Sequence, residues 1–234
     1  MRLFENKDCM EGMKEYPDNY FDLAIVDPPY GINFKYNTYE DTEENLKLII
    51  KYIFPEIIRV SKRAVFFGSH QKIFLYPQPD WIVAYTWNTT GSYGKLGVCQ
   101  WQPILFYGDD IKGFGSVNGL IKSDLIPISG GDGVGFRRME RIEHPCPKPI
   151  NIIKLILRRF ANDGDLILDP MSGSGTTFIA CEDLGFDYVG FEIDKKYYDE
   201  SKERIKKYRS QLNLFNPARK QAQENKQNAL FEKD

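Results

Sequence analysis

A glycine-rich segment that joins an expected strand to an expected helix restricts the fold of this chain more than any other part of its sequence. The strand Asp165–Asp169 is apolar between its acidic ends, and Gly173 and Gly175 separate it from the helical stretch Thr176–Leu184. A second apolar run, Tyr188–Glu192, follows and ends in an acid. A strand, a glycine turn, a helix and another strand are typical of one unit of a parallel α/β sheet.

The rest of the sequence continues the alternation of strands and helices. In the stretch Glu43–Val60, apolar residues recur at helical spacing along one stripe. The other expected elements are the strands Arg2–Glu5, Asp22–Asp27, Ala64–Phe67, Trp81–Trp87 and Gln100–Tyr107, a loop and helix over Asn6–Tyr16, and the helices Ile150–Phe160 and Asp194–Ser210. This order predicts an α/β protein with a doubly wound, Rossmann-like sheet.

Two segments depart from the alternation. From Gly108 to Glu143 glycine is frequent and apolar periodicity is weak, which predicts an irregular insertion rather than more sheet. The chain after Phe215 is rich in Gln, Asn and Lys, and residues 211–234 are expected to form a flexible tail. Residues 1–210 are therefore expected to form a single domain, with residues 108–143 as a small insertion in it.

Composition excludes several classes of protein. Of the 234 residues, 42% are hydrophobic and 27% are charged, as in a globular protein, and no apolar run is long enough to span a membrane. The four cysteines are widely spaced, so neither a zinc site nor a disulfide framework is predicted. We expect a cytoplasmic protein without a metal. Because the net charge is −2, contacts to nucleic acid must come from local basic patches such as Arg137, Arg138 and Arg141.

The glycine-rich loop and the acid that follows it have the chemistry of a nucleoside site. Gly173 and Gly175 allow close approach of the backbone to a ligand at a helix N-terminus, and Glu192 is placed to accept hydrogen bonds from both hydroxyls of a ribose. The dinucleotide fingerprint is incomplete, because Phe178 stands where a third glycine belongs, and no phosphate-loop Gly-Lys-Ser/Thr is present. The alternative is a tight turn with a solvated Glu192.

A second motif, Asp27-Pro28-Pro29-Tyr30, follows the strand Asp22–Asp27. This motif suits methylation of an exocyclic amino group such as that of adenine, whose nitrogen is a poor nucleophile. The Asp27 carboxylate and the Pro28 carbonyl are two acceptors suited to hydrogen-bond its two N–H groups. Tyr30 is suited to stack on the base, a contact worth about 1–3 kcal/mol. Asp27 would also stabilise positive charge that develops on the nitrogen. A rigid proline turn with a buried tyrosine is the alternative.

Together these motifs resemble the amino-group DNA methyltransferases, which act on N6 of adenine or N4 of cytosine. The resemblance covers nearly the whole chain to about Arg209 and rests on D-P-P-Y, on D-P-M-S-G-S-G-T-T from Asp169, and on H-P-C-P-K-P from His144. Met171 replaces the usual aromatic residue, and Lys7 replaces a glycine before Asp8. The order of the motifs is similar to that of the circularly permuted beta class, which implies seven strands with one antiparallel.

The resemblance implies a cofactor, a set of site residues and a reaction. The cofactor is S-adenosylmethionine, and the residues implied to hold it are Asp8, Cys9, Asp27, His144, Lys148, Asp169, Pro170, Met171, Ser172, Gly173, Ser174, Gly175, Thr176 and Glu192. The implied catalytic residues are Asp27, Pro28, Pro29 and Tyr30. The expected reaction is direct methyl transfer to N6 of a flipped adenine in double-stranded DNA, as in restriction-modification systems.

Other readings of the sequence stay open. Asp27 favours adenine as the target, whereas many cytosine-N4 enzymes have serine at this position of the motif. The substrate could instead be RNA or the amide of a protein glutamine. A further alternative is a catalytically silent module that binds DNA or cofactor. The loop Gly31–Asn45, with Tyr36, is either a lid over the base or an ordinary connection, and the insertion with its three arginines is the candidate for target recognition. Gln211-Leu212-Asn213-Leu214-Phe215 resembles a pentapeptide that docks into the DNA sliding clamp, and a homodimer is an open alternative.

Overall fold

The computed structural model describes residues 1–37, 39–86, 92–94, 97–108, 124–127 and 144–215. Its centre is a sheet of eight strands in the order β1-β10-β9-β2-β3-β7-β4-β8. The strands are β1 (Arg2–Glu5), β2 (Leu23–Val26), β3 (Arg63–Phe67), β4 (Trp81–Thr86), β7 (Trp101–Gly108), β8 (Leu125–Pro127), β9 (Leu166–Asp169) and β10 (Asp187–Phe191). The α/β class and the doubly wound sheet are confirmed, and β7 runs antiparallel to its neighbours β3 and β4.

The count of seven strands was wrong, because the insertion contributes an eighth. Residues Leu125–Pro127, inside the segment expected to hold no strand, pair in parallel with Ala84–Thr86 of β4. A run this short shows no periodicity, so its pairing depends on the edge that β4 offers. A separate hairpin joins β5 (Ser92–Gly94) to β6 (Gly97–Cys99). Most of the insertion, with its three arginines, lies outside the described residues.

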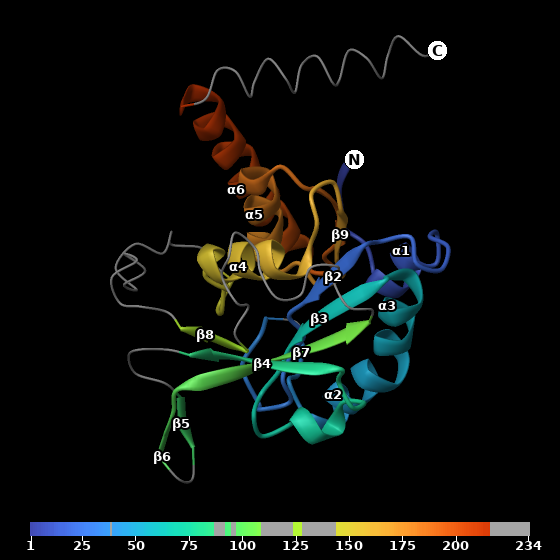
Figure 1. Cartoon of the computed structure of the whole chain (residues 1–234), viewed down its shortest axis with the longest axis vertical. Helices are drawn as coiled ribbons and strands as arrows, with labels where there is room; N and C mark the ends of the chain where they lie inside the picture. The colour runs from blue at the N-terminus through green and yellow to red at the C-terminus, as the bar shows by residue number, and fades with distance from the viewer. Residues whose placement is uncertain (38, 87–91, 95–96, 109–123, 128–143, 216–234) are drawn as a thin grey trace.

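Helices cover both faces of the sheet (Figure 1). On one face lie α4 (Ile150–Phe160), α5 (Thr176–Leu184) and α6 (Lys195–Phe215), and on the other lie α1 (Cys9–Met13), α2 (Glu43–Leu48) and α3 (Phe54–Val60). Each face has its own apolar core, because residues in a strand point alternately to the two sides. In β2, Ile25 packs in the core beneath α4 and α5, while Ala24 and Val26 pack in the core beneath α3.

The predicted helix Glu43–Val60 is continuous but changes pitch in its middle. A π-helical segment, η1 (Ile49–Ile53), separates α2 from α3, and Pro55 follows at the start of α3. Proline has no backbone N–H to donate to the preceding turn, so the hydrogen-bond pattern shifts there. The shift places Ile49 and Ile53 on the wall of the pocket described below.

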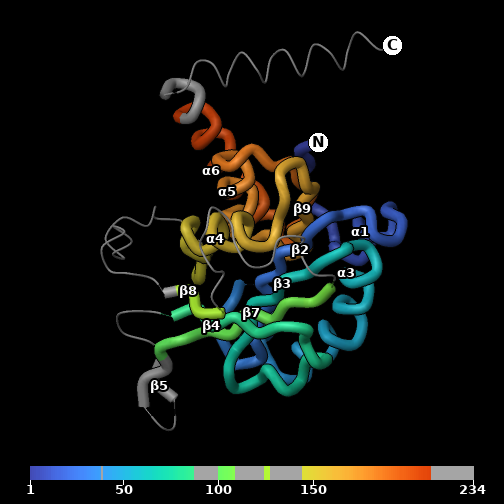
Figure 2. Tube along the Cα trace, viewed as in Figure 1, coloured from blue at the N-terminus to red at the C-terminus, as the bar shows by residue number. Residues whose placement is uncertain are grey.

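The N-terminus and the last helix lie on the same half of the sheet (Figure 2). β1 pairs in parallel with β10, and the buried carboxylate of Glu182 on α5 receives hydrogen bonds from Arg2 of β1 and Arg209 of α6. The last helix is longer than predicted: α6 extends to Phe215, so the segment from Gln211 lies in its final turns. Among the described residues, every helix is too short or too polar to span a membrane.

Candidate functional site

A pocket of about 280 Å³ lies where the carboxyl ends of β2, β9 and β10 meet. These three strands are parallel, with β9 paired to both of the others, so their carboxyl ends share one edge of the sheet. Asp27 follows β2, Pro170 follows β9 and Glu192 follows β10. Ligands in open α/β sheets bind at such an edge.

Most of the residues expected at a site line this one pocket. They are Asp8, Cys9, Asp27, Pro29, Tyr30, Tyr36, His144, Lys148, Asp169, Pro170, Met171, Ser172, Gly173, Ser174, Thr176 and Glu192. Pro28 is buried and does not line it, and Gly175 supplies the left-handed turn (φ 70°) that begins α5. Arg137, Arg138 and Arg141 lie outside the described residues.

Asp27 and Tyr30 are held together by a polar network. The Tyr30 hydroxyl donates to Oδ1 of Asp27 and accepts hydrogen bonds from Nε2 of Gln102 (2.7 Å) and Nζ of Lys148 (2.6 Å). Lys148 Nζ also donates to Oδ1 of Asp27 at 2.9 Å. Burial raises the pKa of Tyr30 well above its ordinary value, and the nearby Asp27 carboxylate adds to the effect, so the phenol stays protonated.

Asp41 organises the loop that follows Tyr30. Its buried carboxylate accepts hydrogen bonds from the backbone N–H groups of Gly31 (2.6 Å), Ile32 (3.2 Å) and Phe34 (3.0 Å). The loop thereby turns back, and the Tyr36 ring lies 6.5 Å from the ring of His144 between centroids. Tyr36 was predicted to contact DNA; the structure places it on the pocket wall.

The glycine-rich loop is packed too tightly for a larger residue at one position. Gly173 has a φ of +47°, and a Cβ there would lie 2.8 Å from Nε2 of His144. The loop is fixed from α6, because Ser201 donates to the Gly173 carbonyl (2.6 Å) and Arg204 donates to the Ser174 carbonyl (2.8 Å). Its backbone therefore lies beside the pocket in one defined conformation.

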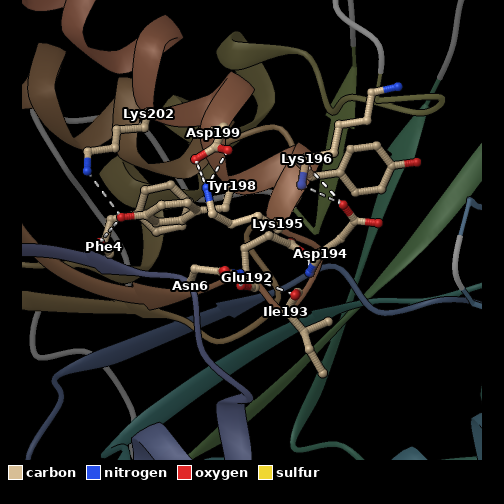
Figure 3. Close-up of polar contacts among 11 residues, drawn as sticks. Phe4, Asn6, Glu192, Ile193, Asp194, Lys195, Lys196, Tyr198, Asp199 and Lys202 are labelled. Carbon is tan, nitrogen blue, oxygen red and sulfur yellow. Dashed lines mark hydrogen bonds and ion pairs between the residues drawn. The ribbon is translucent and has the colours of Figure 1, made fainter.

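Glu192 is held by backbone N–H groups on both of its carboxylate oxygens. Oε1 accepts from the N–H of Asp194 (2.8 Å), and Oε2 accepts from the N–H of Gly173 (2.7 Å). Figure 3 shows the Asp194 contact, together with Asn6 beside the Glu192 backbone. A carboxylate fixed in this way presents its remaining lone pairs to the pocket, which suits it to accept hydrogen bonds from two neighbouring hydroxyls.

Burial shifts the ionisation of several groups around the pocket. It raises the pKa of Asp169 to about 7, with the nearby carboxylates of Asp27 and Glu192 acting in the same direction. Burial also raises the pKa of Glu192 and lowers that of His144. The pocket thus disfavours additional negative charge. A positive group on a bound ligand would lower the pKa of Asp169 and favour its ionised form.

Several residues of this site were missed from the sequence. Gln102 lies in β7, and only the pairing of strands brings it to Tyr30. Tyr197 lines the pocket with its ring 4.8 Å from that of His144 between centroids, and no motif surrounds it in the sequence. Asp41 also lies outside any motif, but an acid that follows a loop rich in aromatic residues was a usable signal. Lys148 was assigned to the cofactor, and the structure places its ammonium on Asp27 and Tyr30.

Comparison of the sequence with known proteins gives a consistent set of relatives. The profile of a family described as DNA methylase matches residues 130–203, which include the glycine-rich loop and Glu192. The Type II methyltransferase M.HpaI of Haemophilus parainfluenzae is 27% identical over 232 residues, and the alignment covers 84% of this chain and 72% of that protein.

Solved structures show the same fold. The crystal structure of the M1.HpyAVI–SAM complex superposes with a TM-score of 0.62 at 21% identity, covering 87% of this chain and 100% of the other. The cytosine-N4-specific PvuII DNA methyltransferase superposes with a TM-score of 0.63 at 14% identity, covering 88% and 90% of the two chains. At these identities the likeness concerns the arrangement of strands and helices.

Proposed function

Because this chain is related to the amino-group DNA methyltransferases, we propose that it transfers the methyl group of S-adenosylmethionine to an exocyclic amino nitrogen in DNA, at N6 of adenine. The observation that carries the proposal is that two separate motifs meet in one pocket. Asp27 and Tyr30 come from the end of β2, and Gly173 and Glu192 come from the ends of β9 and β10. An acceptor for an amino group thus lies beside a site for a nucleoside.

The residues present fit the cofactor. Glu192, fixed by two N–H groups, suits the ribose hydroxyls, and the backbone of the loop Ser172–Ser174 lines the same pocket. When bound, S-adenosylmethionine supplies an electrophilic methyl group on a positively charged sulfur. Asp169, which is buried in the wall of the same pocket, is the carboxylate that this charge would favour.

The catalytic loop performs the remaining tasks. The Asp27 carboxylate accepts a hydrogen bond from the target amino group and stabilises the positive charge that develops on its nitrogen, which releases one proton to solvent after the methyl group is transferred. The Pro28 carbonyl is the proposed second acceptor, and the Tyr30 ring, fixed by hydrogen bonds at its hydroxyl, stacks on the flipped base. The loop after Tyr30, anchored by Asp41, is the proposed lid over that base.

The choice of adenine rests on Asp27, and cytosine N4 is the second candidate. The test is to incubate the protein with radiolabelled S-adenosylmethionine and unmethylated genomic DNA, digest the DNA to nucleosides and identify the labelled base. Label in N6-methyladenine is the expected result. Label in N4-methylcytosine would keep the mechanism and replace the base, and DNA without label would contradict the proposed function.

Affinity for the cofactor should depend on pH through Asp169, whose pKa is raised to about 7 by burial. Below that pH the Asp169 carboxyl is protonated. Because the positively charged sulfonium favours the ionised carboxylate, its binding then requires that Asp169 release a proton. The dissociation constant for S-adenosylmethionine should rise by up to about tenfold between pH 7 and pH 6. That for S-adenosylhomocysteine, which has a neutral sulfur, should change less.

Calorimetry with both ligands at several pH values checks this expectation. The two ligands share their ribose, amino and carboxylate groups, so the titration of other residues contributes equally to both. Asp169→Asn is the control, and in that variant the difference between the two pH profiles should disappear. Parallel profiles for the two ligands in the unaltered protein would exclude the role of Asp169.

Three further contacts are proposed, one with the DNA sequence and two with protein chains. The insertion with Arg137, Arg138 and Arg141 is the proposed reader of the DNA sequence. Docking to a sliding clamp is proposed for Gln211–Phe215, which forms the end of α6. A homodimer is proposed by resemblance to the beta class.

A further inference from the structure

The two carboxylate oxygens of Asp27 have different surroundings. Oδ1 accepts hydrogen bonds from the Tyr30 hydroxyl and from Nζ of Lys148. Within the ranges that the structure describes, Oδ2 has no hydrogen-bond partner from the protein. The carboxylate lies on the pocket wall with its side chain 29% exposed, so one oxygen is held by the protein and the other is available to a ligand.

Lys148 is unusually well enclosed for a lysine. Its side chain is 8% exposed, and its ammonium lies 5.1 Å from the centroid of the Tyr30 ring and 4.9 Å from that of Phe67. A buried ammonium is costly unless it is paired and hydrogen-bonded, and Asp27 and Tyr30 supply its partners. Lys148 is thus built into the catalytic loop, although it comes from the segment before α4.

We propose that Lys148 is a positioning residue, which fixes Asp27 through Oδ1 so that Oδ2 is the oxygen that accepts a hydrogen bond from the target amino group. The inference rests on the proposed function. A carboxylate held at one oxygen by two donors has lost its freedom to rotate, so the free oxygen meets the substrate already aligned. Such preorganisation of charged groups lowers the barrier of the chemical step rather than the affinity for the cofactor.

The Tyr30 hydroxyl extends the same restraint to the base. It donates to Oδ1 and accepts from Lys148 and Gln102, so the plane of the ring and the direction of the carboxylate are set together. Loss of the ammonium would leave one donor in place of two on Oδ1 of Asp27 and one in place of two on the Tyr30 hydroxyl, so both groups would be held less firmly. We therefore expect removal of Lys148 to slow methyl transfer more than it weakens DNA binding.

The test separates a role in positioning from the role in cofactor binding that the resemblance implied. Lys148→Met keeps the length of the apolar stem and removes the ammonium. With cofactor and DNA both saturating, its single-turnover rate should fall about 10- to 100-fold, a loss of roughly 1.4–2.7 kcal/mol of transition-state stabilisation. Its dissociation constant for S-adenosylmethionine should stay within about threefold of the unaltered protein, which also shows that the variant is folded.

Lys154→Met is the matched control, because Lys154 of α4 forms a comparable ion pair with Asp183 (2.6 Å) and does not line the pocket. It should keep both rate and affinity. If Lys148→Met does not fold, Lys148→Arg, which moves the donors but keeps the charge, should give the same split between rate and affinity. An unchanged rate, or a loss that disappears at saturating cofactor, would overturn the inference. Absence of methylation by the unaltered protein would instead refute the proposed function.

Discussion

Replacing Asp27 with alanine should slow methyl transfer by about 10²–10³-fold while the cofactor still binds. Asp27 is the proposed acceptor of a hydrogen bond from the target amino group, and it is proposed to stabilise the charge that develops on nitrogen. Removal of one group that stabilises a transition state in this way costs about 10²–10³-fold in rate. Because Glu192, the proposed ribose acceptor, follows another strand, affinity for S-adenosylmethionine should change much less than the rate.

Single-turnover methylation and calorimetry on the same preparation measure the two quantities. Asp27→Asn, which keeps the shape but not the charge, should also be slow, since an amide has one acceptor in place of two. Asp80→Asn is a suitable control, because Asp80 is exposed at the start of β4 and bonds the N–H of Gly108. Retention of more than about a tenth of the rate in Asp27→Ala would remove this carboxylate from the mechanism.

Glu192→Ala is expected to have the second large effect, and it acts on affinity. The substitution removes the proposed acceptor of the ribose hydroxyls and leaves the N–H groups of Gly173 and Asp194 without their partner. An unpaired buried donor costs about 1–3 kcal/mol. We expect the dissociation constant for S-adenosylmethionine to rise roughly a hundredfold, or about 2.7 kcal/mol.

The rate at saturating cofactor should be largely kept in this variant, because Glu192 does not contact the catalytic loop among its described hydrogen bonds. Titration calorimetry and the dependence of rate on cofactor concentration both report the change. Glu203→Gln, an exposed change on α6, serves as the control. A loss of rate without loss of affinity would assign Glu192 to a different task.

The elements and the site differ in how far the sequence predicts them. The run D-L-A-I-V-D and the glycine-rich loop predicted β2, β9 and α5, because apolar runs and glycines report local structure. Their shared edge followed from the rule that ligands bind at the carboxyl ends of parallel strands. Asp27, Asp169 and Glu192 lie in one pocket, as their places at the carboxyl ends of the expected strands Asp22–Asp27, Asp165–Asp169 and Tyr188–Glu192 predicted.

Contacts between distant segments were not predictable in the same way. Gln102 reaches Tyr30 because β7 inserts in reverse between β3 and β4, and no local pattern in the sequence encodes that neighbour. Lys148 was recognised within H-P-C-P-K-P, but the target of its ammonium depends on how the segment before α4 packs against β2. The pairing of β8 depends likewise on an edge formed by another part of the chain.

The order of strands in the sheet also determines when the pocket can exist during synthesis of the protein. β2, β3, β4 and β7 are complete once residue 108 has been made, whereas β1 waits for β10 and one edge of β2 waits for β9. Until then that edge of β2 presents unpaired backbone groups, a template for association with other chains. The two halves of the proposed active site are thus joined only after residue 192 has been made, and a chain released before that point would carry the D-P-P-Y loop without the proposed site for its methyl donor.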